Sequence, residues 1–145
     1  MNKLKMFLPM TRTIFFVTLI ALLTKPIIIN ATEECKIVRL SGQAFPQLTV
    51  RVDPELLVVK KGTCVVWINW ARTTEVKVKF NEGKRCKDNT KAPVGFKLDE
   101  LGCYVTDYIP EGGTSSLLFD QQGTFDYVVE APGLTTPAKG SILVE

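Results

Sequence analysis

The sequence predicts an all-β sandwich or barrel, and three observations predict it. Short runs rich in β-branched and aromatic residues recur after residue 31, as in 64–70 (CVVWINW) and 124–130 (TFDYVVE). Turns marked by Gly and Pro separate these runs at intervals of about 8–12 residues. No stretch in this part of the chain has the sustained apolar periodicity of a helix.

The first expected strand covers residues 49–52 (TVRV), where apolar and polar residues alternate until Asp53-Pro54 ends the pattern. Residues 56–59 (LLVV) form the second, closed by a turn at 60–62 (KKG), and 64–70 form the third. Between 76 and 80, Lys77 and Lys79 alternate with apolar residues, which predicts a strand with one buried face and one solvent-exposed face.

The second half of the chain has three further expected strands. Residues 84–103 are polar and irregular, so they predict an excursion from a plain sandwich. Strands then follow at 115–119 (SSLLF), 124–130 and 141–144 (SILV), separated by Gly- and Pro-containing turns at 108–113 and 131–133.

The N-terminus has the pattern of a secretory signal. Lys3, Lys5 and Arg12 precede an unbroken apolar run at 14–23 (IFFVTLIALL). This run is too short to cross a bilayer, because a membrane-spanning helix needs about 20 apolar residues. We expect a signal helix within a signal peptide at 1–31, cleaved after Ala31, and one domain at 32–145. The alternative is an uncleaved anchor, through which alone the protein would contact the membrane. The expected location is periplasmic or secreted, or membrane-anchored facing the periplasm.

Charge and composition exclude several classes of function. Four of the 18 basic residues lie before residue 32 and all 15 acidic residues follow it, so residues 32–145 carry a formal charge of −1. A nearly neutral domain lacks the positive field that binds nucleic acid. The chain also has no His, which excludes Ser-His-Asp and Cys-His machinery, and we expect no enzyme activity.

Four cysteines in an exported domain predict two disulfides. Cys35, Cys64, Cys86 and Cys103 lack any CxxC spacing, which speaks against a zinc site. Three pairings are possible, and we favour the pairing of sequence neighbours, Cys35 with Cys64 and Cys86 with Cys103.

Two segments of the chain resemble cupredoxins. Residues 53–69 (DPELLVVKKGTCVVWIN) are similar to the family's run of Pro, aliphatics, a Lys-Gly turn and Val-x-Trp-x-Asn. Residues 123–144 (GTFDYVVEAPGLTTPAKGSILV) are similar to its Gly-Thr-Tyr/Phe-x-Tyr-x-Cys strand, its ligand loop with His and Met, and its final Gly-x-Ile-x-Val strand. Residues 81–113 match poorly. The resemblance implies an all-β Greek-key sandwich or barrel of the cupredoxin type.

The same resemblance implies that a type-1 copper site is missing. Such a site needs two His and one Cys, usually with a weak axial Met. The thiolate position is Val129, the second His falls near Pro132, the axial Met near Pro137, and the first His at Thr74 or Glu75. We therefore expect no copper and no other cofactor. Pro132 and Pro137 would stiffen the former ligand loop, because proline fixes the backbone angle φ.

The strand at 64–70 is apolar on both sides. The face that carries Val66, Ile68 and Trp70 is either covered by the 84–103 excursion or free to bind a partner.

Charged residues in the middle of the chain allow two interpretations. Six basic residues could form a solvated strand face that discourages edge pairing, or a docking site for an acidic partner: Lys77, Lys79, Lys84, Arg85, Lys87 and Lys91. Asp99, Glu100 and Asp107 lack the spacing of a calcium loop, so we interpret them as scattered surface carboxylates.

Taken together, the sequence predicts an exported, non-catalytic, cupredoxin-like domain that binds an envelope or extracellular protein. The alternative is a metal-binding or electron-transfer protein with non-standard ligands such as Cys, Asp and Glu.

Overall fold

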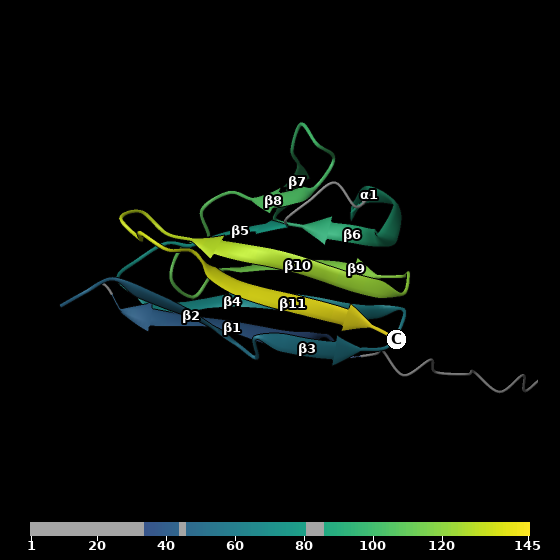
Figure 1. Ribbon diagram of the computed structural model, residues 1–145, viewed down its shortest axis with the longest axis horizontal. Helices are drawn as coiled ribbons and strands as arrows, with labels where there is room; N and C mark the ends of the chain where they lie inside the picture. Colours follow the sequence, from purple (N-terminus) through teal and green to yellow (C-terminus); the bar gives the residue numbers. More distant parts are fainter. Residues whose placement is uncertain (1–33, 44–45, 81–85) are drawn as a thin grey trace, which may run out of the picture. The chain divides into compact units, whose positions relative to one another are not determined.

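The computed structural model describes residues 34–43, 46–80 and 86–145, apart from the side chain of Cys86. These residues form two β-sheets (Figure 1), and side chains from both sheets make one hydrophobic core. The five-stranded sheet has the order β2-β1-β4-β9-β6, and the six-stranded sheet has the order β3-β11-β10-β5-β8-β7. The expected all-β sandwich is therefore confirmed.

The strands alternate between the sheets along much of the chain. In the five-stranded sheet they are β1 (Lys36–Gln43), β2 (Thr49–Asp53), β4 (Thr63–Arg72), β6 (Thr90–Val94) and β9 (Thr114–Phe119). In the six-stranded sheet they are β3 (Leu56–Val59), β5 (Lys77–Phe80), β7 (Phe96–Leu98), β8 (Tyr104–Thr106), β10 (Gly123–Glu130) and β11 (Ala138–Val144). One short helix, α1 (Cys86–Asn89), precedes β6.

The core is centred on Trp67 of β4. Because successive side chains of a strand point to opposite faces, every second residue of β4 from Thr63 to Ala71 is buried. The Trp67 ring packs against four other aromatic rings, with centroid separations of 5.4–6.4 Å: Phe80, Phe96, Phe119 and Tyr127. These rings come from both sheets, so the aromatic cluster joins the two layers.

Tyr127 of β10 is buried in this cluster, and its hydroxyl has no hydrogen-bond partner among the described residues. Burial raises the pKa of Tyr127 to about 12, because the charged phenolate is poorly solvated there. The indole N–H of Trp67, although it forms no regular hydrogen bond with the hydroxyl, offsets part of that rise.

The raised pKa predicts a loss of stability in alkali. An unfolded tyrosine ionises near its ordinary pKa of about 10 while the folded one keeps its proton, so this contribution is complete below pH ~10 and is lost as the pH rises towards ~12. The loss should reach about 2–3 kcal/mol at its limit. Urea unfolding of wild type and Tyr127→Phe across this range measures it. Equal pH dependence in the two proteins would contradict the expectation.

The absence of a side chain at Gly140 of β11 leaves room for the Tyr127 ring. A Cβ atom built on Gly140 would lie 2.4 Å from both Cζ and the hydroxyl oxygen of Tyr127 and 2.8 Å from Cε2. Only glycine therefore fits opposite this ring, since Tyr127 and Gly140 are directly paired in the ladder of β10 and β11.

Gly140→Ala should lower the free energy of unfolding by about 3 kcal/mol, at the upper end of what overpacking of a core costs. Denaturant titration measures the loss. A double-mutant cycle with Tyr127→Ala is the control: when the ring is gone, the alanine at 140 should cost almost nothing. If Gly140→Ala were equally destabilising without the ring, a steric clash with Tyr127 would not be its cause.

Several elements of the structure differ from those predicted from the sequence. No strand was predicted at β1, which contributes Val38 and Leu40 to the core. Residues 84–103 were predicted to be irregular, but within the described part of this segment α1 is followed by β6 and β7, which extend one edge of each sheet. This segment therefore adds edge strands instead of covering the outer face of β4.

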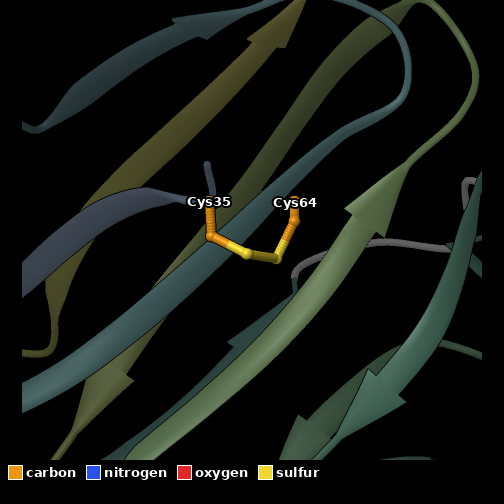
Figure 2. Close-up of a disulfide and its surroundings, with 2 residues drawn as sticks. All are labelled: Cys35 and Cys64. Carbon is orange, nitrogen blue, oxygen red and sulfur yellow. A yellow bond between two sulfur atoms is a disulfide. The ribbon is translucent and has the colours of Figure 1, made fainter. Parts of the chain in front are cut away.

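Two of the cysteines form a disulfide across the parallel pair of β1 and β4. Lys36 is in register with Val65, which places Cys35 directly opposite Cys64, and the two Cα atoms are 4.5 Å apart. Figure 2 shows the bond crossing between these neighbouring strands. The predicted pairing of Cys35 with Cys64 is confirmed.

The described residues do not test the second predicted disulfide or the signal peptide. Cys103 is buried, but the side chain of Cys86 lies outside the described residues, so their pairing stays a prediction. The signal segment at 1–31 also lies outside them. Within the described ranges, no helix has the length and apolar character needed to span a membrane.

Candidate functional site

Asn69 organises one end of the sandwich. Its side chain is fully buried and makes three hydrogen bonds: Nδ2 donates to the carbonyls of Thr74 (3.0 Å) and Ile109 (2.8 Å), and Oδ1 accepts from the amide of Ala71 (2.9 Å). The backbone of Asn69 also bonds with Gly112 and Gly113. This one residue therefore connects the end of β4 to the β4–β5 loop and to the turn that precedes β9.

A pocket of about 400 Å³, open to solvent, lies beside this junction. The β4–β5 loop contributes two hydroxyl side chains and one carboxylate to it, and the β10–β11 loop and the segment before β2 contribute apolar groups. The lining residues are Leu48, Thr73, Thr74, Glu75, Pro132 and Gly133.

Thr73 has a strained backbone at the rim of this pocket. Its φ of 58° is in the left-handed region, which a β-branched residue rarely adopts. Two hydrogen bonds stabilise this conformation: its amide donates to the Glu111 carboxylate (3.1 Å), and its hydroxyl donates to the carbonyl of Arg72 (2.7 Å).

Thr73→Asn should raise the free energy of unfolding by about 0.5–1 kcal/mol, because Asn tolerates the left-handed region far better than Thr. The change in melting temperature measures the gain. Thr74→Asn is the matched control, since Thr74 does not share the positive φ. A gain of the same size at position 74, or none at 73, would contradict the role of strain.

The structure brings together two of the four positions at which the resemblance places copper ligands. Thr74 and Pro132 both line the pocket. Val129 is fully buried in β10, in register with Ala138 and Val78, and Pro137 is exposed outside the set of lining residues. The alternative position for the first His, Glu75, is the only acidic group of the lining.

The acidic residues considered for a metal site have other roles. Asp99 accepts hydrogen bonds from the amides of Leu101 and Cys103, and so closes a local turn. Asp107 pairs with Lys97, which holds the pKa of that carboxyl below its usual range. Across the described residues, no three His, Cys, Asp or Glu side chains gather as they would around a metal ion.

The outer side of the five-stranded sheet carries the apolar side chains predicted from β4. We call Val66, Ile68, Trp70 and the neighbouring Ile37 of β1 the Trp70 face. Val66 and Ile68 are half-buried, whereas Trp70 is 53% and Ile37 45% exposed. The idea that the 84–103 excursion covers this face is wrong for Trp70, which is exposed, and the described part of that segment forms the edge strands β6 and β7.

The lysines of β5 do not protect a sheet edge. β5 lies between β10 and β8, so the proposed guarding role of Lys77 and Lys79 is wrong, although Lys79 does point to solvent. Lys77 lies 4.5 Å from the ring centre of Tyr108, and Lys91 pairs with Asp120 at 2.5 Å. Lys87 is exposed, and Lys84 and Arg85 lie outside the described residues. The described members are therefore dispersed over α1, β5 and β6.

Sequence reasoning missed three contributors to these surfaces. Leu48 lines the pocket, and nothing in its local pattern distinguishes it. Thr73 has a left-handed backbone conformation, which its β-branched side chain gave no reason to expect. Arg39 stacks over the Trp70 ring, 5.3 Å from its centre, and only the unexpected strand β1 brings it there.

Comparison with known proteins supports the fold. No protein-family model and no curated protein matches the chain. Three solved amicyanin structures each cover 80% of this chain and 87% of their own. They are a reduced copper(I) variant at pH 4 (19% identity, TM-score 0.51), an oxidised variant (20%, 0.52) and another reduced variant (19%, 0.52). At this identity the likeness concerns the fold alone, which is that of the cupredoxins.

Proposed function

We propose that this protein is an exported, copper-free, non-catalytic domain that binds a protein partner through the Trp70 face. The exposure of Trp70 on an otherwise regular sheet is the observation that carries the proposal. Exposed tryptophans are costly to leave in water and are enriched among the residues that dominate protein interfaces. The partner we envisage is an envelope or extracellular protein.

Two features support the absence of a type-1 copper site. The chain has no His at any position, so it lacks the imidazoles that such a site requires. The position that the resemblance assigns to the thiolate is Val129, whose side chain packs in the core. The disulfide between Cys35 and Cys64 supports export, since such bonds persist in oxidising compartments.

The alternative is a metal-binding or electron-transfer protein with non-standard ligands. Glu75 is the single acidic side chain of the pocket, and hydroxyl groups and proline complete its rim. Such a set offers few donors to a soft metal, which prefers thiolate and imidazole. We therefore favour the binding module.

Metal analysis separates these two functions. We expect protein isolated from its native compartment to contain far less than one copper per chain and to show no thiolate-to-copper absorption band after copper is added. Stoichiometric copper with that band would overturn the copper-free proposal.

Photo-cross-linking tests the binding role. A photoreactive residue introduced at position 70 should capture a discrete protein in the native envelope, and Ile37→Ala in the same chain should reduce the yield. A photoreactive residue at Leu101, which is 78% exposed but lies between β7 and β8 of the other sheet, is the matched control. Equal capture from both positions, or none from position 70, would reject the Trp70 face as an interface.

A further inference from the structure

We propose that the Trp70 face binds an acidic polypeptide segment of the partner, with an apolar side chain of that segment placed on Trp70 and its carboxylates placed on surrounding arginines. This inference rests on the proposed function, because it assumes that the partner is a protein. It adds the chemistry by which that partner is recognised.

Three arginines surround Trp70 on the outer side of the five-stranded sheet. Residues in register share a face, so the pairing of Trp70 with Ser41, and of Ser41 with Arg51, places Arg51 in the row of Trp70. Arg39 is in register with Ile68 and stacks over the Trp70 ring. Arg72 is two residues beyond Trp70 on β4 and therefore lies on the same side. We call Arg39, Arg51 and Arg72 the arginine rim.

The arginine rim is only weakly neutralised within the protein. Arg39 pairs with Asp53 at 3.9 Å, where both side chains are at least half exposed, so the pair contributes little. Arg51 and Arg72 are exposed and form no ion pair with any described residue. Guanidinium groups bind carboxylates in a bidentate manner, which makes the rim complementary to Asp and Glu side chains.

The arrangement also has the layout of a protein interface. Apolar residues lie in the middle and charged residues lie around them, and Trp and Arg are the residue types that most often dominate binding energy. The stacking of Arg39 on Trp70 restrains both side chains before binding, which lowers the entropy that association costs.

Two synthetic peptides and one polysaccharide are suitable probes of the natural chain. The first peptide is rich in Glu around a single Leu, the second has Gln in place of each Glu, and the third probe is polygalacturonate, an anionic chain without apolar side groups. We expect the Glu peptide to bind at least about tenfold more tightly than the Gln peptide, with a preference that weakens as salt is added. Calorimetry gives the affinities. A change in tryptophan fluorescence that Trp70→Ala abolishes reports binding at the Trp70 face, since the buried Trp67 contributes to the signal in both proteins.

Variants of the arginine rim provide the sharper test. Arg51→Glu with Arg72→Glu should remove the preference for the Glu peptide, and Trp70→Ala should weaken its binding at least about tenfold. Lys79→Glu with Lys139→Glu is the matched control, since it makes the same change in net charge on the outer side of the six-stranded sheet, where both lysines flank Val128. Circular dichroism and melting temperatures establish that each variant is folded.

Several outcomes would overturn the inference. They are equal affinity for the two peptides, the same loss in the lysine control as in the arginine variant, and tighter binding of polygalacturonate than of the Glu peptide. If position 70 cross-links to a protein in the envelope but the captured segment is neutral or basic, the inference fails while the proposed function stands. If position 70 captures no protein, the proposed function itself fails.

Discussion

Asn69→Ala should lower the free energy of unfolding by about 4 kcal/mol, the largest effect that we expect from a single side chain. The substitution leaves the carbonyl of Thr74 and the amide of Ala71 without the partner that Asn69 supplies. It also removes one of the two bonds that the carbonyl of Ile109 accepts, the other being from the amide of Val76. Each buried polar group that loses its only partner costs about 1–3 kcal/mol. Urea unfolding monitored by far-ultraviolet circular dichroism measures the change.

Asn69→Asp is the informative companion. The carboxylate keeps the shape of the side chain and the bond from Ala71, but it cannot donate to Thr74 and Ile109. It should therefore destabilise the protein at least as much as alanine does near neutral pH, where a buried charge adds a further cost. A loss below about 1 kcal/mol in both variants would show that the three bonds contribute little net stability.

Removal of the disulfide between Cys35 and Cys64 should cost about 3.5 kcal/mol. The bond closes a loop with a sequence separation of 29, and in the chain-entropy model a loop of this size restrains the unfolded chain by about that amount. Cys35→Ala, Cys64→Ala and the double variant, unfolded in urea, measure the effect.

The three variants should behave alike, because each lacks the same single bond. In a double-mutant cycle, the second substitution should add less than about 0.5 kcal/mol to the first. Additive losses would mean that the two side chains stabilise the sheet by packing and not through the disulfide. The single variants also leave one new thiol each, and alkylation of that thiol prevents disulfides between chains without reducing any other disulfide.

The sequence predicts the strands that have a clear apolar pattern, whether they lie inside a sheet or at its edge. Residues 56–59 are a strand as expected, and β4, β9, β10 and β11 lie where alternating or continuous apolar runs place them. β1 escaped notice because Val38 and Leu40 are its only buried residues and Ile37 points outward, which blurs the period of two. β6 contains Pro93 and a left-handed Ala92 with a shift in register, features that a sequence pattern assigns to loops.

The surfaces were predictable only in part. The resemblance to cupredoxins indicated Thr74 and Pro132, which do share a pocket, and the apolar pattern of β4 indicated Trp70. The arginine rim was not predictable, because its three members come from β1, β2 and β4 and meet only through strand register. Local patterns carry no information about which strands become neighbours.

The position of Cys35 has a mechanical consequence. It lies at the very start of β1 and is bonded to Cys64 in β4, the strand that carries the central Trp67. Tension applied to the chain ahead of Cys35 would pass through the sulfur atoms directly into β4. Strand β1 would carry no load, so it could not be peeled from the sheet one hydrogen bond at a time.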